Sequence, residues 1–181
     1  LSPSPLVMDN VGNTKITTTS CSVPKWHQRQ PYNAQVPIWD DSKGQPGPIG
    51  CTALALGQIM SVHQFPATYD WSVISGRTHI PISDTYAATE VSQMLIDVAN
   101  AIKTEFEPGK AVVGTVDMLN GLYYTLNYSV SATYYGNNPL PMSDILTEIQ
   151  NGRPIVITGK EPGAEVGHAY GIDGAIQGQR Q

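Results

Sequence analysis

The most continuous apolar stretch of the chain runs over residues 51–62. Its clearly polar exceptions are Thr52, Gln58 and Ser61. A helix that is apolar on nearly every face is normally buried at the centre of a domain. Because the preceding segment 43–50 is rich in glycine and proline, it reads as a turn. The pattern therefore predicts a central buried helix that begins at Cys51.

Two later segments show the spacing of amphipathic helices. Over 85–105, apolar residues recur at intervals of four, three and four, and Pro108 and Gly109 are expected to close that helix. Segment 116–126 predicts a second helix, although a glycine inside it weakens the prediction. Its residues expected to face inward are Val116, Leu119, Leu122, Tyr123 and Leu126.

The C-terminal part of the chain favours strands. A short helix is expected over 143–150, with Ser143 as its N-cap and Gly152 as its stop. Strands are expected at 15–19, 130–135, 154–158 and 168–174. Residues 177–181 read as a polar stub. Because helices dominate the first half and strands the second, the fold class predicted is α+β.

Composition narrows the class of protein. The chain has 181 residues, enough for one domain with a real core. Its net charge of −5 and the lack of a basic cluster argue against nucleic acid or an acidic membrane surface as partner. No apolar run reaches the length of a membrane span, and no signal peptide is present. Sparse charge with many Ser, Thr, Asn, Gly and Tyr residues suits an exported protein.

Cys51 is the first candidate for chemistry. In the first turn of a buried helix, unpaired backbone N–H groups and the positive end of the helix dipole favour a thiolate over a thiol. The alternative is a small buried hydrophobe, since free cysteine is among the most buried residue types. A disulfide with Cys21, the other cysteine, would consume the nucleophile and is not expected. We expect Cys21 to have no functional role.

His168 is the second candidate. It opens an expected strand directly after the glycine-containing loop 159–167. A base at the mouth of a strand, facing a thiolate at a helix start, is the geometry of cysteine-nucleophile hydrolases. The alternative is a structural histidine at a sheet edge, and position along the chain does not show that His168 meets Cys51.

The remaining titratable residues give weaker signals. His63 reads as a helix-end residue, His27 as a surface residue beside Gln28, and His79 lies in an irregular segment. None has metal-ligand spacing, so neither a metal nor another cofactor is expected. Asp173 lies five residues after His168 and should face the other side of the strand, so we do not assign it to a catalytic triad.

Three motifs together resemble one family. Segment 50–66 carries Gly-Cys, Gln-Ile-Met and His-x-x-Pro in that order, 26–33 carries Trp-His-Gln-x-x-Pro-Tyr-Asn, and 167–174 carries Gly-His-Ala-Tyr-x-Ile-Asp-Gly. Gly-Arg-Pro-Ile-Val precedes the last motif at 152–156. This order resembles the streptopain-like cysteine peptidases, secreted bacterial relatives of papain. The resemblance covers most of residues 24–176.

The resemblance implies a papain-like fold, with a helical part carrying the cysteine and an antiparallel β part carrying the histidine. By position, it implies Cys51 as nucleophile, His168 as general base and acid, and Gln28 as an oxyanion donor beside the Cys51 backbone N–H. Thr52 and Leu54 depart mildly from the family pattern.

A larger departure follows His168. The family's next segment, which is rich in Trp, Gly and Asn and orients the histidine, is absent before Gln181. We therefore expect the natural protein to continue past Gln181 with at least two more strands. The domain boundaries expected are a lead or pro-segment junction at 1–23 and a peptidase domain at 24–181 that lacks its C-terminal strands.

The function expected is that of a bacterial cysteine endopeptidase that is made as a zymogen and is secreted or held at the cell surface or in the periplasm. Its partners would be protein or peptide substrates, and its own pro-segment or a dedicated inhibitor. The alternative is a catalytically inactive papain-like module that binds or inhibits. A weaker third option is an acyltransferase or amidase acting on non-peptide substrates.

Overall fold

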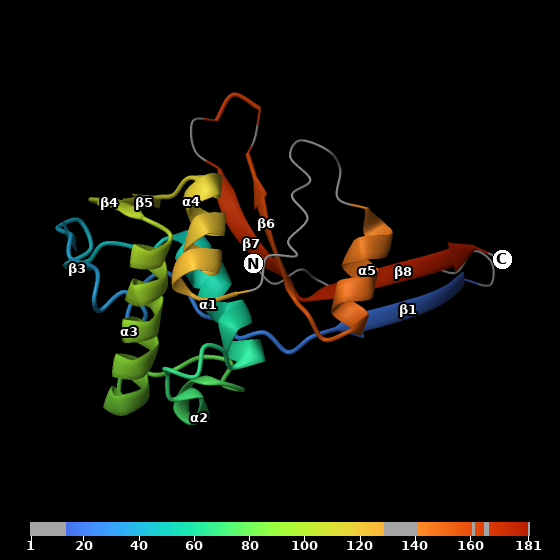
Figure 1. The fold of residues 1–181 in the computed structure, drawn as a ribbon, viewed down its shortest axis with the longest axis horizontal. Helices are drawn as coiled ribbons and strands as arrows, with labels where there is room; N and C mark the ends of the chain where they lie inside the picture. The colour runs from blue at the N-terminus through green and yellow to red at the C-terminus, as the bar shows by residue number, and fades with distance from the viewer. Residues whose placement is uncertain (1–13, 129–140, 161, 165–166, 181) are drawn as a thin grey trace.

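The computed structural model describes residues 14–128, 141–160, 162–164 and 167–180. A helical part forms one side of the molecule and a β-rich part the other (Figure 1). The main helices of the helical part are α1 (Cys51–His63) and α3 (Thr85–Ala101), with a short α2 (Trp71–Ile74) beside them. The α4 helix (Thr115–Asn120) runs directly into η1 (Gly121–Thr125), a turn of π-helix.

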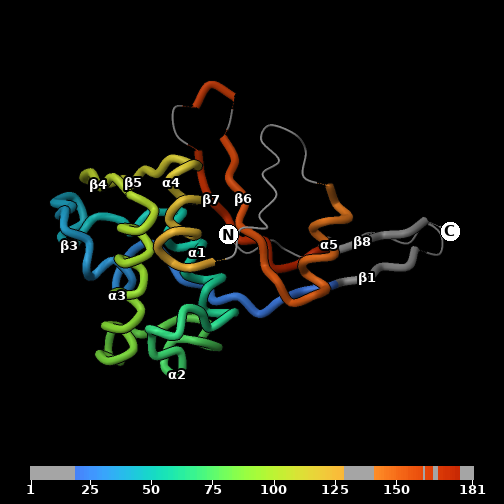
Figure 2. Tube along the Cα trace, in the orientation of Figure 1, coloured from blue at the N-terminus to red at the C-terminus, as the bar shows by residue number. Residues whose placement is uncertain are grey.

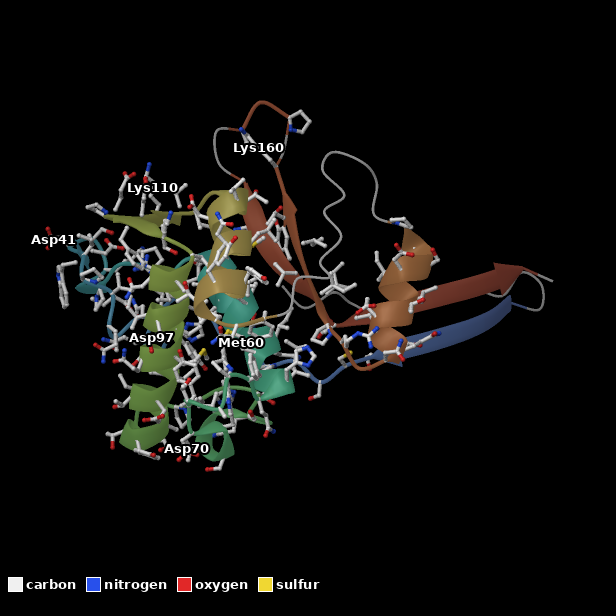
Figure 3. The ribbon with its side chains drawn as sticks, in the orientation of Figure 1. Asp41, Met60, Asp70, Asp97, Lys110 and Lys160 are labelled. Atoms are coloured by element: carbon white, nitrogen blue, oxygen red, sulfur yellow. The ribbon has the colours of Figure 1, made fainter. Side chains whose placement is uncertain are left out.

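The core lies mainly between α1 and α3. Buried side chains of both helices pack there, joined by residues from the connecting segments. They include Ala53, Leu56, Met60, Val91, Met94, Leu95 and Val98. Figure 3 shows Met60 on α1 within this crowded interior. Gly57 lets the two helices approach closely, because a Cβ there would lie 2.4 Å from Leu95 Cδ2. The buried central helix expected at 51–62 is confirmed.

The β-rich part consists of two antiparallel ladders. Strands β6 (Ile155–Gly159) and β7 (His168–Ile172) pair with Gly159 opposite His168. Strands β1 (Thr14–Ser20) and β8 (Gly174–Arg180) pair along their whole length, and α5 (Met142–Gln150) packs against them. Figure 2 shows β6 and β7 beside α1, which agrees with the contacts that α1 makes with both strands. The α+β class is confirmed.

Two small hairpins complete the described fold. One joins β2 (Trp39–Asp40) to β3 (Gln45–Pro46), and the other joins β4 (Glu105–Glu107) to β5 (Lys110–Val112). Pro108 and Gly109 form the turn of the second hairpin, with Gly109 at φ 80°. The helix expected over 85–105 is therefore confirmed but ends at Ala101, and the prediction that these two residues close it is wrong.

The helix expected over 116–126 is confirmed as α4 and η1, and Leu126 is buried. Two of its residues expected inward are instead exposed, Val116 by 70% and Tyr123 by 49%. A π-turn has more residues per turn than an α-helix, so it shifts which side chains share a face. Gly121, which begins this turn, lies against the carbonyl of Ala101, where a Cβ would come within 2.5 Å of the oxygen.

The helix expected over 143–150 is confirmed, but its cap is not Ser143. The helix begins at Met142 after Pro141, and the Ser143 hydroxyl donates to the Asp144 carboxylate. The stop is correct, since Gly152 follows the helix with φ 70°.

The strands expected at 15–19 and 154–158 are confirmed in β1 and β6. The one expected at 168–174 divides into β7 and the start of β8, and residues 177–180 belong to β8 rather than to a stub. The strand expected at 130–135 lies outside the described residues.

Candidate active site

The cysteine stands where the sequence predicts it, at the first residue of α1. Gly50 precedes it with φ 95°, a conformation that favours glycine, and its carbonyl accepts the first helical hydrogen bond from the Leu54 amide. Gly50 brings no side chain to cap the helix, so among the described residues no side chain hydrogen-bonds to the N–H groups of its first turn. The thiol is half-buried and free of any disulfide, as is that of Cys21.

A direct contact joins the helix start to β7. The backbone N–H of Ala169 donates to Cys51 Sγ, with the nitrogen and sulfur 3.4 Å apart. The two residues are 118 positions apart in the chain, so this contact depends on the fold. Ala169 itself is buried, and the next residue back is His168. The structure thus brings the cysteine motif and the histidine motif together through the backbone.

His168 opens β7 and is exposed. Its imidazole ring lies against the ring of Tyr170, with centroids 4.7 Å apart and planes 76° from parallel. Both rings line a cleft of about 570 Å³ on the side where β6 gives way to the loop toward β7. Its other lining residues are Gly159, Lys160, Pro162, Ala164 and Gly167. Figure 3 shows Lys160 beyond the end of β6, on that loop.

Gln28 is held close to the start of α1. Its backbone carbonyl accepts a 3.2 Å hydrogen bond from the amide of Ile49, two residues before Cys51. Its side chain is half-buried. Farther back, Gln58 on α1 reaches out to the same segment, and its Nε2 donates to the Pro24 carbonyl at 2.7 Å. The Gln28 segment is therefore held by one hydrogen bond from the residues just before the cysteine helix and by another from the helix itself.

An ion pair fixes the other flank of the Gln28 segment. Arg29 Nη1 lies 2.9 Å from Asp40 Oδ2, and the Asp40 side chain is almost fully buried. The Ser42 hydroxyl, which donates to this carboxylate at 2.6 Å, lowers the pKa of Asp40 most, and Arg29 lowers it further against the opposing effect of burial. Asn33 adds hydrogen bonds to the carbonyls of Pro46 and Gly47, so the segment packs firmly onto the β2–β3 hairpin.

The candidate groups for acyl transfer lie at the start of α1 and at the start of β7. A backbone N–H aimed at sulfur stabilises a thiolate more than a thiol, because hydrogen bonding to the charged form favours that form. The positive end of the α1 dipole acts in the same direction. The Cys51 amide and the Gln28 side chain are the candidate donors for an oxyanion, and the roles of Cys51, His168 and Gln28 remain predictions at this point.

The other candidate residues lie elsewhere. His63 is the exposed last residue of α1, and His27 packs edge-on against Tyr32 and shares a separate cleft with His79. Asp173 lies between β7 and β8 rather than on a strand with His168, and its carbonyl accepts from the Cys21 amide. Within the described residues, no group of three or more His, Cys, Asp or Glu side chains could hold a metal ion.

Cys21 lies away from the cleft. Its thiol donates to the Ile149 carbonyl at 3.5 Å. Burial, and secondarily the nearby Asp173 carboxylate, raises the pKa of this thiol. Cys21 is thus a poor thiolate former.

Three residues of the site were missed from the sequence. Gln58 gave a usable signal, because an amide within an apolar helix needs a partner. Ala169 and Tyr170 belong to the Gly-His-Ala-Tyr motif, but the motif indicated no role for them, since their roles depend on contacts with Cys51 and His168.

Comparison with known proteins finds similarity to one group of peptidases. The model of the Peptidase C10 family matches residues 26–68, which hold the Gln28 and Cys51 motifs. The chain is 25% identical over 178 residues to the thiol protease/hemagglutinin PrtT of Porphyromonas gingivalis, a match that covers 82% of this chain and 20% of that protein. It is 23% identical over 190 residues to streptopain of Streptococcus pyogenes, covering 83% of this chain and 47% of that protein. The chain therefore spans about half the length of streptopain and less of PrtT.

The fold has a solved counterpart. A fragment of prointerpain A from Prevotella intermedia superposes with a TM-score of 0.65 at 21% identity, covering 87% of this chain and 58% of that one. This match shows the papain-like fold. No helix in the described part of the chain is long and apolar enough to cross a membrane. The resemblance read from the three motifs is confirmed: the chain is similar to the streptopain-like cysteine peptidases, and its residues 26–68 match the Peptidase C10 family model.

Proposed function

We propose that this protein is a cysteine endopeptidase that cleaves peptide bonds through an acyl-enzyme on Cys51. The observation that carries the proposal is the 3.4 Å contact between the Ala169 amide and the Cys51 sulfur. This contact joins the nucleophile helix to the strand that begins with His168. The names of the relatives, thiol protease and streptopain, support the same reaction class.

In the proposed mechanism, the Cys51 thiol passes its proton to His168, and the Cys51 thiolate attacks the peptide carbonyl carbon, which forms a C–S bond and leaves negative charge on the oxygen. The Gln28 side chain and the Cys51 N–H donate to that oxyanion. The C–N bond then breaks, and His168 gives its proton to the departing amine. His168 next takes a proton from water, which attacks the thioester, and the acid product leaves as the thiolate reforms.

The biological setting follows from the family and is part of the proposal. Substrates would be proteins or peptides, and the protein would be secreted by a bacterium. Prointerpain A is by its name a pro-form, which supports a zymogen here, regulated by its own pro-segment or by a dedicated inhibitor.

Hydrolysis of a casein-derived fluorogenic substrate tests the function. Cys51→Ala and His168→Ala should each lose at least about 10³-fold in kcat/KM, because nucleophile and base act as one unit. Cys21→Ala is the matched control and should retain wild-type activity, since Cys21 lies outside the cleft. A Cys51→Ala variant that keeps more than about a tenth of the activity would reject the mechanism. A wild-type protein without activity would favour the binding or inhibitory alternative.

A further inference from the structure

The imidazole of His168 has no side chain opposite it on the paired strand. The residue that pairs with His168 on β6 is Gly159, which has no side chain. Even a Cβ built at Gly159 would meet nothing within 4 Å. Cross-strand side chains normally pack against each other at such positions and restrict rotamers. The strand pair therefore leaves His168 without a cross-strand support.

Tyr170 fills this role along the strand instead. Side chains two residues apart on a strand project from the same face, so those of His168 and Tyr170 share one face of β7. Ala169, between them, is buried on the other face. The Tyr170 ring meets the His168 ring at a centroid distance of 4.7 Å in an edge-to-face arrangement. Aromatic pairs favour this geometry because the positive edge of one ring meets the negative face of the other.

We propose that Tyr170 is a positioning residue, whose ring fixes the orientation of the His168 imidazole in the cleft. The proposal rests on the proposed function insofar as it concerns catalysis. A catalytic imidazole must present one nitrogen to the sulfur and move protons between fixed points, so free rotation of the ring lowers the fraction in the productive orientation. Tyr170 acts through His168 and needs no contact with substrate.

The geometry also indicates which part of Tyr170 matters. The contact is between rings, and within the described part of the chain the Tyr170 hydroxyl makes no hydrogen bond to His168. Phenylalanine should therefore replace tyrosine without loss, whereas alanine should not. Because the Tyr170 side chain is 52% exposed, its truncation should leave the core intact. Tyr124 offers a matched control, since it is an exposed tyrosine that also forms an edge-to-face pair, with Tyr123, at 4.7 Å.

Two measurements test the proposal. In steady-state kinetics, Tyr170→Ala should lower kcat by roughly 2- to 12-fold, the factor that corresponds to the worth of one aromatic pair, with KM little changed. Tyr170→Phe and Tyr124→Ala should stay within twofold of wild type. Circular dichroism should show all three variants folded. A Tyr170→Ala enzyme with unchanged kcat, or a Tyr170→Phe enzyme as impaired as Tyr170→Ala, would overturn the proposal.

The second measurement needs no activity. In the Cys51→Ala protein, proton NMR of His168 should show its ring protons shifted by the ring current of Tyr170. The shift should persist in Tyr170→Phe and vanish in Tyr170→Ala. If this pattern holds but the wild-type protein proves inactive, the proposed function fails while the packing role stands. If the His168 signals ignore Tyr170→Ala, the positioning role fails whatever the activity.

Discussion

Gln58→Ala is the substitution whose effect can be worked out most directly from the structure. Gln58 lies on α1, and its Nε2 donates to the carbonyl of the buried Pro24 at 2.7 Å. This hydrogen bond connects the cysteine helix to the segment that carries Gln28. Truncation leaves the Pro24 oxygen without that donor.

The expected loss can be bounded. Leaving a buried carbonyl unsatisfied costs about 1–3 kcal/mol of the free energy of unfolding. Alanine recovers a few tenths of a kcal/mol through its higher helix propensity. The net destabilisation expected is therefore about 1–2 kcal/mol.

A matched control isolates the effect of the partly buried hydrogen bond. Gln93 on α3 also donates from Nε2, to Asp97 at 2.9 Å, but this pair is exposed to solvent. Gln93→Ala carries the same gain in helix propensity, and its free energy of unfolding should change by at most about 0.5 kcal/mol. Urea unfolding of both variants, followed by tryptophan fluorescence, gives the comparison. If the two variants have the same free energy of unfolding, the stabilising role of the Gln58–Pro24 hydrogen bond is refuted.

Three further predictions concern other parts of the molecule. Gln28→Ala should lower kcat about 10²- to 10³-fold if its side chain is an oxyanion donor, and an unchanged kcat would make Gln28 structural. Gly121→Ala should lower the free energy of unfolding by about 1–3 kcal/mol, measured in urea, because its Cβ would meet the backbone oxygen of Ala101; an unchanged value would contradict the close approach. Because the pKa of Asp40 is lowered, its contribution to stability is present above the ordinary aspartate pKa, near 4, and is lost as pH falls through the folded value. Asp40→Asn should accordingly lower the urea midpoint at pH 7. Between pH 7 and pH 3, the midpoint of this variant should fall less than that of the wild type. Equal falls in the two proteins would argue against a stabilising role of the Asp40 carboxylate.

The predictions made from the sequence were most accurate for features that depend on local residue patterns. The central helix and its start at Cys51 follow from an apolar run after a glycine-rich turn, and both are present in the structure. Ser143 shows the limit of local reasoning: it has the right side chain for an N-cap, but Pro141 takes the cap position and the helix begins at Met142, one residue earlier than expected. The exposure of Val116 could not be foreseen, because a helix that turns into a π-helix does not keep one periodicity.

Contacts between residues far apart in the chain could not be predicted from the sequence. The pairing of β1 with β8 joins opposite ends of the chain, and nothing in the polar composition of 177–180 indicated a strand there. Likewise, the three motifs named Cys51 and His168 as candidates, but only the fold shows the Ala169 amide at the sulfur. The partner of Gln58 was equally hidden, although the need for one was visible.

The central claim is that Cys51 is an activated nucleophile, and its rate of alkylation tests that claim most directly. The protein is treated with iodoacetamide at pH 6, and mass spectrometry of its peptides follows Cys51 and Cys21 separately. At this pH an ordinary thiol is less than about 1% thiolate, and the pKa of Cys21 is raised further. The account predicts that Cys51 reacts at least about 100-fold faster than Cys21, and that His168→Ala removes most of the difference. Equal rates at the two cysteines would contradict it.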